Sequence, residues 1–85
     1  MAEYKIFFRR SAVKDLYPIP KNDLQRIIKR IRLLTKDPRP RGCEKLSRQE
    51  RYRIRQGNYR IVYSVQDDQL NVQIVKIAHR RDIYR

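Results

Sequence analysis

Residues 51–65 alternate between side chains of opposite character, and this pattern constrains the fold more than any other feature of the chain. Successive side chains of a β-strand point to opposite faces of the sheet. A strand over 51–55 therefore places Tyr52 and Ile54 on one face and three arginines on the other. Such alternation is typical of a sheet that packs one face on a core and exposes the other to solvent.

The alternating segment predicts a hairpin. Residues 56–58, Gln-Gly-Asn, predict a tight turn because Gly and Asn tolerate positive φ. Residues 59–65 are rich in β-branched and aromatic side chains and predict the returning strand. The hairpin would place Arg53, Arg55 and Arg60 on one surface with an apolar layer behind them. That surface is either a cradle for a phosphate backbone or an ordinary solvated sheet face.

A strand and two helices are predicted before the hairpin. Residues 4–9 alternate as a first strand, and Ser11 is a suitable N-cap for a short helix that ends near Pro18. A longer helix is expected from near Pro20 to about Lys36. Its apolar residues recur at spacings of three and four, as one buried face requires: Leu24, Ile27, Ile28, Ile31 and Leu34.

The remaining strands complete an α+β fold. A short strand is expected over 43–46 and a last strand over 70–78. Strands joined by short turns are antiparallel, so we expect two N-terminal helices packed on one face of a small antiparallel sheet, in the order β-α-α-β-β-β(-β). Regular alternation in the last strand would separate Val72, Ile74 and Ala78 from Val75 and Ile77.

The charge of the chain limits its partners. The 85 residues, enough for a single domain over 1–85, include 22 Lys and Arg against 9 Asp and Glu, a formal net charge of +13. This favours an anionic partner: nucleic acid, an acidic protein or a membrane surface. We expect no membrane partner, because no apolar run approaches the roughly 18 residues of a spanning helix. The single cysteine, Cys43, excludes an intrachain disulfide, and with no secretory signal at residues 1–10 we expect a cytoplasmic protein.

Basic and aromatic side chains are interleaved around the predicted hairpin. Residues 39–60 hold eight basic side chains against two acidic ones, a net charge of +6. Tyr52, Tyr59, Tyr63 and Tyr84 lie in or after this region. Basic groups hold phosphates and aromatic rings stack on unpaired bases, a combination that suits single-stranded RNA. For the three tyrosines of the hairpin, packing in the core is the favoured alternative.

Familiar enzyme motifs are missing. The sequence has no P-loop, no GxSxG and only one histidine, and Asp67-Asp68 fits a turn better than a metal site, so we expect neither a metal nor a cofactor. One nuclease route remains, because RNA carries its own nucleophile, the 2′-hydroxyl. Positioning and arginine charges could accelerate its attack on phosphorus. The proton could pass through His79, with a reference pKa near 6.5, or Tyr84, with one near 10.

Three segments, Tyr52–Arg55, Tyr59–Tyr63 and Ile77–Arg85, resemble the RelE branch of the RelE/ParE toxins of type II toxin–antitoxin systems. The resemblance covers nearly the whole chain. It implies helices on one face of an antiparallel sheet. It also implies an endoribonuclease that cuts messenger RNA in the ribosomal A site by 2′-hydroxyl attack without a metal.

The resemblance also assigns residues. It implies catalytic roles for the following side chains: Arg53, Arg55, Arg60, Arg80 and Tyr84. His79 is a further candidate for proton transfer, since arginine replaces the lysines that the best-known member has at the two alternating positions. The remaining basic side chains expected to contact RNA are Lys45, Arg48, Arg51, Arg81 and Arg85.

The implied partners are a cognate acidic antitoxin that folds over the helices and the sheet edge, and the ribosome with its messenger RNA. Three alternatives stay open. The first is a ParE-like protein that poisons DNA gyrase by binding. The second is a non-toxic basic RNA-binding domain, and the third is a toxin that has lost activity. Arg60, Arg80 and Tyr84 together favour the ribonuclease.

Overall fold

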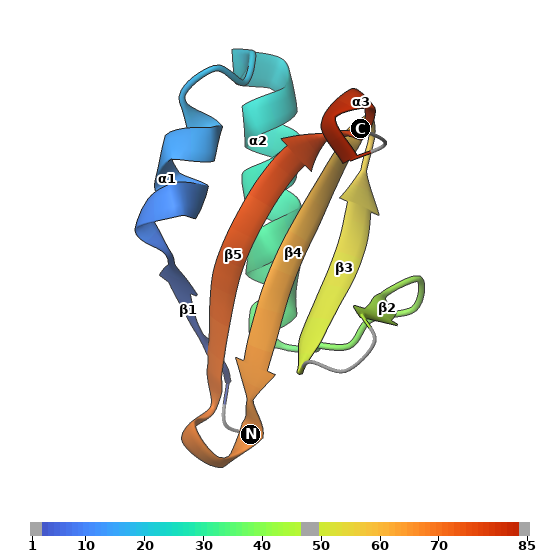
Figure 1. Cartoon of the computed structure of the whole chain (residues 1–85). Coiled ribbons are helices and arrows are strands. Elements are labelled where there is room, and N and C mark those ends of the chain that lie inside the picture. Colours follow the sequence, from blue (N-terminus) through green and yellow to red (C-terminus); the bar gives the residue numbers. More distant parts are fainter. Residues whose placement is uncertain (1–2, 47–49, 84–85) are drawn as a thin grey trace.

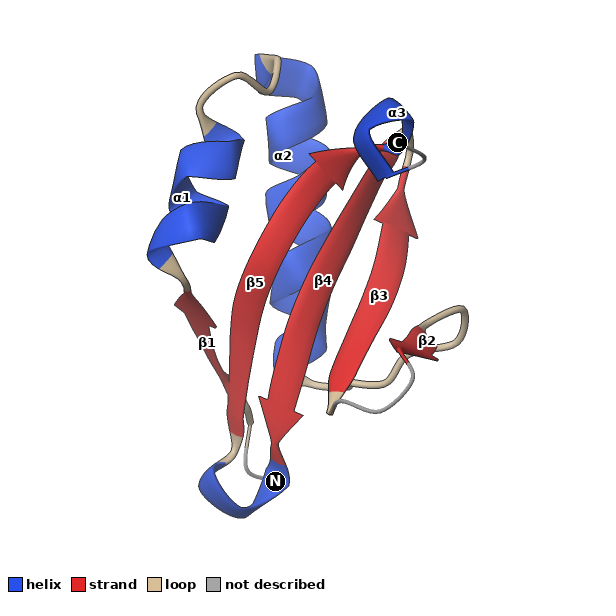
Figure 2. Cartoon of the chain, in the orientation of Figure 1, coloured by secondary structure: helices blue, strands red, loops and turns tan. Residues whose placement is uncertain are grey.

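Two helices lie behind a curved sheet in the computed structural model, which describes residues 3–46 and 50–83 (Figures 1 and 2). This two-layer arrangement confirms the predicted α+β class. The elements in chain order are β1 (Lys5–Phe8), α1 (Arg10–Leu16), α2 (Lys21–Arg32), η1 (Leu33–Thr35), β2 (Glu44–Leu46), β3 (Arg51–Gln56), β4 (Tyr59–Gln66), η2 (Asp67–Gln69), β5 (Asn71–His79) and α3 (Arg80–Ile83).

The sheet is mixed, so the prediction of a wholly antiparallel sheet is wrong at one strand. Its order is β1-β5-β4-β3-β2, and β1 runs parallel to β5 while the other pairs are antiparallel. The antiparallel rule holds for strands joined by short turns, whereas α1, α2 and three further strands separate β1 from β5 in the chain. The two helices carry the chain across one face of the sheet before β2 begins (Figure 1).

The predicted hairpin is present, but its turn is one residue shorter than predicted, because Gln56 still belongs to β3 and pairs with Tyr59. Tyr52 lies opposite Tyr63, Ile54 opposite Ile61, and Arg55 opposite Arg60. The turn between the strands depends on Gly57, whose φ of +60° is in the left-handed region that favours glycine.

A β-bulge changes the alternation of β5. The register with β4 shifts between Val62 and Tyr63, whose partners are Lys76 and Ile74. The extra residue turns Ile77 into the helix-side core, where Val72 and Ile74 also lie. The prediction that Ile77 and Val72 occupy opposite faces is therefore wrong, because a bulge cannot be read from alternation alone.

The core lies between α2 and the sheet. Most of the predicted stripe packs there, with Ile27, Ile31 and Leu34 buried against the inward side chains of β3, β4 and β5. Tyr52 and Tyr63 are also buried in this cluster, which confirms the core alternative for these two tyrosines. No helix within residues 3–46 and 50–83 is long and apolar enough to cross a membrane.

The C-terminal half of β5 packs against α1. It has no partner in β1, since β1 pairs only with Asn71–Ile74. The Ser11 hydroxyl donates to the carbonyl of Val75 at 3.2 Å, and the Ile77 amide donates to Asp15 Oδ2 at 3.0 Å. The predicted N-cap role of Ser11 is wrong: the N-cap is Arg9, two residues earlier, and the Ser11 hydroxyl binds the strand. These contacts fix the end of β5 that leads into α3.

Candidate functional site

Four arginines, Arg51 among them, share the face of the sheet that α1 and α2 leave uncovered, which we call the open face. Arg53, Arg55 and Arg60 reach it from β3 and β4, and Arg60 lies between Arg55 on one neighbouring strand and Ala78 on the other. Only 8% of Arg60 is exposed, and its guanidinium donates to the carbonyl of Tyr59 at 3.3 Å. The structure thus brings together the three basic positions expected from the alternation, with Arg60 the most constrained.

Lys76 joins the open face and was not predicted to do so. It pairs with Val62, which pairs in turn with Arg53. Regular alternation would have placed Lys76 among Val72, Ile74 and Ala78, and an exposed lysine in such an apolar set was the signal of a register change. The bulge resolves that conflict by moving the ammonium group to the basic side.

Glu44 is a second open-face residue that the sequence did not single out. It lies opposite Arg53 in the pairing of β2 with β3. Its Oε2 is 2.9 Å from Arg53 Nη2, and its Oε1 is 4.0 Å from Arg55 Nη2. The hydrogen bond and charge of Arg53 lower the pKa of the Glu44 carboxyl, with smaller contributions from Arg55 and Arg60. The carboxylate therefore remains ionised beside the arginines.

The C-terminal end of β5 lies against the turn of the hairpin. The backbone amide of Arg80 donates to the carbonyl of Asn58 at 2.6 Å, which anchors the start of α3. The rings of His79 and Tyr59 meet edge to face with centroids 5.3 Å apart. His79 Nδ1 accepts from the Arg81 amide at 3.2 Å and from Arg81 Nε at 3.5 Å. When the imidazole is neutral, its proton is consequently on Nε2.

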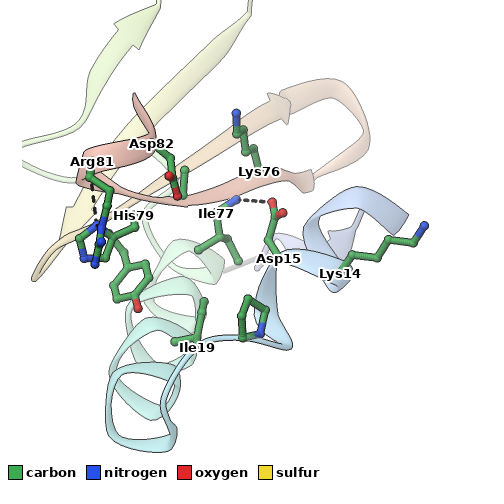
Figure 3. A pocket seen from close by; sticks show the side chains of 11 residues that line it. Lys14, Asp15, Ile19, Lys76, Ile77, His79, Arg81 and Asp82 are labelled. Carbon is green, nitrogen blue, oxygen red and sulfur yellow. Dashed lines mark hydrogen bonds between the residues drawn. The ribbon is translucent and has the colours of Figure 1, made fainter. Parts of the chain in front are cut away.

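A pocket of about 500 Å³ lies between α1, the end of β5 and α3 (Figure 3). It does not include Arg53, Arg55 or Arg60, but two residues of its lining, Lys76 and Ala78, belong to the open face. The pocket and the three arginines therefore adjoin along β5. Its charged and imidazole groups are Lys14, Asp15, Lys76, His79, Arg81 and Asp82.

The other predicted RNA contacts are dispersed. Arg51 lies on the open face opposite Ser64, two residues before Arg53. Lys45 pairs with Tyr52, so it does not share the open face with Arg53. Its ammonium group is 3.7 Å from the Glu50 carboxylate. Arg80 and Arg81 are exposed at the start of α3. Three of the predicted residues lie outside the described part of the chain: Arg48, Tyr84 and Arg85.

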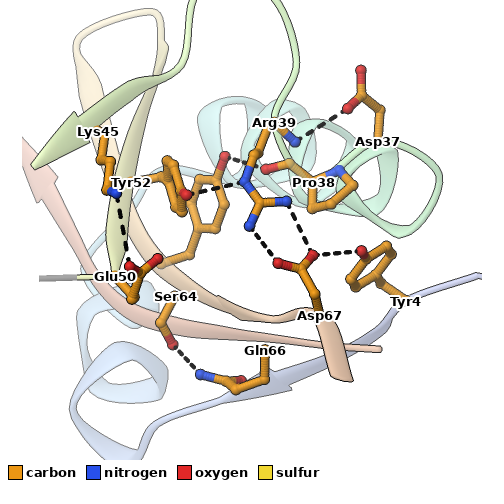
Figure 4. A network of polar contacts seen from close by, with 11 residues as sticks. Tyr4, Asp37, Pro38, Arg39, Lys45, Glu50, Tyr52, Ser64, Gln66 and Asp67 are labelled. Atoms are coloured by element: carbon orange, nitrogen blue, oxygen red, sulfur yellow. Dashed lines mark hydrogen bonds and ion pairs between the residues drawn. The ribbon is translucent and has the colours of Figure 1, made fainter. Parts of the chain in front are cut away.

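Arg39, one of the basic residues counted before the hairpin, is occupied in a polar network (Figure 4). Its two terminal nitrogens donate to the two carboxylate oxygens of Asp67 at 3.0 and 2.7 Å, and its Nε donates to the Tyr52 hydroxyl at 3.0 Å. The Tyr4 hydroxyl also donates to Asp67. These contacts lower the pKa of Asp67 to about 2, with Arg39 as the largest cause. We call this set of four residues the latch, since it ties the loop before β2 to the β4–β5 turn.

The sequence is similar to known proteins over nearly its whole length. Residues 6–84 match the family model described as the ParE toxin of the type II toxin-antitoxin system, parDE. The chain is 31% identical over 86 residues to Toxin RelG of Mycobacterium tuberculosis (strain ATCC 25618 / H37Rv), a match that covers 96% of this chain and 97% of RelG.

Two solved toxin–antitoxin complexes contain chains of similar fold. One is the RelBE2 complex of Mycobacterium tuberculosis, with a TM-score of 0.82, 27% identity, and coverage of 92% of this chain and 99% of that one. The other is the archaeal RelE–RelB complex of Pyrococcus horikoshii OT3, with a TM-score of 0.82, 30% identity, and coverage of 91% and 94%.

Proposed function

Because this chain belongs to the RelE/ParE superfamily and is a toxin of a type II toxin–antitoxin system, we propose that it acts as a RelE-type endoribonuclease. Its substrate is messenger RNA in the ribosomal A site, and the reaction is attack of a 2′-hydroxyl on the adjacent phosphorus without a metal. The observation that carries this proposal is the placement of Arg55 opposite Arg60, with Arg53 on the same open face.

The arginines supply electrostatic stabilisation. In the attack the 2′-oxygen forms a bond to phosphorus and the bond from phosphorus to the 5′-oxygen breaks, which leaves a 2′,3′-cyclic phosphate and a 5′-hydroxyl. Negative charge builds on the two non-bridging oxygens in between. Guanidinium groups held in place beforehand stabilise that charge at little cost of reorganisation. Arg60 is suited to this role because its burial limits its movement.

The proton transfers need a different group, since arginine stays protonated. One proton leaves the 2′-hydroxyl and one reaches the departing 5′-oxygen. Arg81 donates to Nδ1 of His79, so the neutral imidazole has its one proton on Nε2. To act as the acid, His79 must first be protonated on Nδ1 and give up the bonds from Arg81; its Nε2 proton can then pass to the leaving oxygen. Arg80, Arg81 and Arg51 would hold the flanking phosphates, and Tyr84 remains the second candidate for proton transfer or for stacking on a base.

The toxin also requires an antitoxin. RelB accompanies RelE in the Pyrococcus horikoshii complex. For this chain, with its formal charge of +13, we infer a cognate antitoxin rich in acidic residues. Its binding would neutralise the toxin until the antitoxin is removed.

The ParE description of the family model favours a second candidate, a gyrase poison that acts by binding and cuts no RNA. This candidate does not require an arginine cluster on the open face. The two functions therefore differ in their dependence on Arg60.

The test is primer extension on a defined messenger RNA with and without 70S ribosomes. Wild-type protein should give ribosome-dependent cuts, and Arg60→Ala should lower the rate by about 10²- to 10³-fold, the usual loss of one preorganised transition-state donor. Arg60→Lys keeps the charge and should retain part of the activity. Arg26→Ala, at an exposed position of α2, is the matched control and should cleave as wild type.

Circular dichroism must show that the Arg60 variants fold, because the residue is buried. Undiminished cleavage by folded Arg60→Ala would refute the assignment of Arg60. Growth arrest with DNA damage signalling but without cleavage would refute the ribonuclease and support the gyrase poison.

A further inference from the structure

We propose that Glu44 is a positioning residue of the RNA site: its carboxylate holds the guanidinium group of Arg53 in place, and it gives up its more distant partner Arg55 to a phosphate when RNA binds. The inference rests on the proposed function, since it assumes that these arginines bind the RNA backbone. Through Glu44, the edge strand β2 would help to hold the arginines in place before RNA binds.

The geometry of the contact resembles that of a bound phosphate. Each carboxylate oxygen of Glu44 faces one arginine, at 2.9 Å for Arg53 and 4.0 Å for Arg55. A phosphodiester likewise offers two non-bridging oxygens and one negative charge to paired guanidinium groups. A phosphate that takes the place of the carboxylate beside Arg55 therefore brings the same negative charge to that guanidinium group.

The guanidinium group of Arg53 is only partly satisfied in the described part of the chain. Its side chain is only 27% exposed, and its Nε is buried without a hydrogen-bond partner among residues 3–46 and 50–83. A buried donor without a partner carries a free-energy cost, and an acceptor can relieve it only if the side chain moves to bring Nε to the surface. The guanidinium of Arg53 is thus held at one end by Glu44 and unsatisfied along its Nε edge.

Electrostatics explain why a carboxylate is needed here. Three guanidinium groups on adjacent positions of one sheet face repel each other, in a chain that already carries +13. An anion beside them favours the arrangement in which they converge. The lowered pKa of the Glu44 carboxyl, caused first by Arg53 and also by Arg55 and Arg60, reports the same interaction from the acidic side.

The second ion pair on this sheet edge provides the contrast. Lys45 and Glu50 are 3.7 Å apart, and their side chains are 58% and 73% exposed. That pair has the properties of an ordinary surface salt bridge, which contributes little. The 4.0 Å approach of Glu44 to Arg55, whose side chain is 61% exposed, is of the same kind. The 2.9 Å hydrogen bond to Arg53, whose side chain is 27% exposed, is what distinguishes Glu44. Glu50→Gln changes the net charge by the same amount as Glu44→Gln without touching the open-face arginines, so it is a matched control.

The first experiment measures binding without cleavage. A fluorescent single-stranded RNA with 2′-O-methyl groups throughout lacks the nucleophile, and its affinity is measured by anisotropy over a range of salt concentrations. Glu44→Gln should bind more tightly than Glu50→Gln, and its plot of log K against log salt should be steeper by about 0.7, the value for one more phosphate contact on a single strand. Equal slopes for the two variants would overturn the proposal.

The second experiment separates positioning from competition. In single-turnover cleavage of messenger RNA on saturating ribosomes, Glu44→Gln should have a rate constant about tenfold below that of Glu50→Gln, although it binds RNA more tightly, because misplacement of catalytic groups by about 1 Å is costly. An equal or faster rate overturns the positioning role. A change in the shape of the pH–rate profile would also overturn it, by making the carboxylate a proton carrier.

The two proposals fail differently. If wild-type protein cuts no RNA, the proposed function is lost, while the difference in binding slope between the two glutamine variants still tests Glu44. If wild type cuts RNA and Glu44→Gln behaves as Glu50→Gln in both experiments, only the role of Glu44 is lost.

Discussion

The imidazole of His79 accepts hydrogen bonds from Arg81 through Nδ1 and lies edge-on to Tyr59. Asparagine at this position can place its Oδ1 where Nδ1 was, so His79→Asn keeps an acceptor for the Arg81 amide and loses the Nε2–H group. We expect the variant to fold as wild type and to cleave RNA about 10²- to 10⁴-fold more slowly, the usual range for loss of a general acid or base.

Single-turnover cleavage on ribosomes measures this effect, with thermal unfolding as the check on the fold. If His79→Asn cleaves at the wild-type rate, the role of proton transfer must belong to Tyr84 or to another group. The reverse experiment, Tyr84→Phe, should then produce the larger loss.

At the scale of elements, the latch of Tyr4, Arg39, Tyr52 and Asp67 joins segments that are distant in the chain: the start of β1, the loop before β2, β3 and the β4–β5 turn. Asp67 accepts hydrogen bonds from both Tyr4 and Arg39. Asp67→Asn therefore removes the ion pair with Arg39 and leaves that guanidinium group with fewer contacts. We expect a lower melting temperature for Asp67→Asn at neutral pH.

The pH dependence of this effect has a definite sign. The folded-state pKa of Asp67 is about 2, below its ordinary value of 3.8. A lowered folded-state pKa contributes stability above the unfolded value, and that stability is lost as pH falls through the folded value. The difference in melting temperature between wild type and Asp67→Asn should therefore be largest near neutral pH and shrink between about pH 4 and pH 2. A difference that is constant with pH would contradict the role of the ion pair.

Local patterns predicted the elements that short-range rules determine. The alternation of 51–65 predicted that Arg53, Arg55 and Arg60 share one face, and the stripe of α2 identified its buried face. The parallel pairing of β1 depends on the path of two helices, and the position of Lys76 depends on a bulge. The pairing of β1 has no local signal, whereas Lys76 in an otherwise apolar alternating set was a sign that regular alternation fails in β5.

The same distinction applies to the site. Arg53, Arg55 and Arg60 could be grouped from one hairpin. Glu44 belongs to a three-residue edge strand, and its position opposite Arg53 follows from long-range pairing across a loop. In the sequence Glu44 is only one of two acidic residues in a basic segment, and nothing there indicates its contact with Arg53. The distinction between free and occupied basic groups, such as Arg39, also required the folded structure.

At the scale of the whole molecule, basic charge is present on both layers. The open face carries the arginines of β3 and β4, while the last turn of α2 carries Lys29, Arg30 and Arg32. A groove on the outer side of α2 combines apolar and basic side chains: Leu24, Gln25, Ile28, Lys29 and Arg32. An acidic antitoxin segment with an apolar stripe would fit both properties, so we expect the helical layer to bind the antitoxin and leave the open face to the proposed RNA site.

This division predicts how salt and charge affect the toxin–antitoxin complex. Lys29→Glu places an acidic group in the groove of α2, whereas Lys21→Glu makes the same charge change at an exposed position in the first turn of the same helix, outside the groove. At about 50 mM salt, where the Debye length exceeds 10 Å, Lys29→Glu should weaken antitoxin binding on the order of tenfold and Lys21→Glu much less. Near 1 M salt screening should remove most of the difference. Calorimetric titration of both variants with the cognate antitoxin measures these affinities. Equal losses in the two variants would mean that the net charge attracts the antitoxin and the groove does not receive it, while losses that persist at high salt would make the contact at Lys29 one of packing.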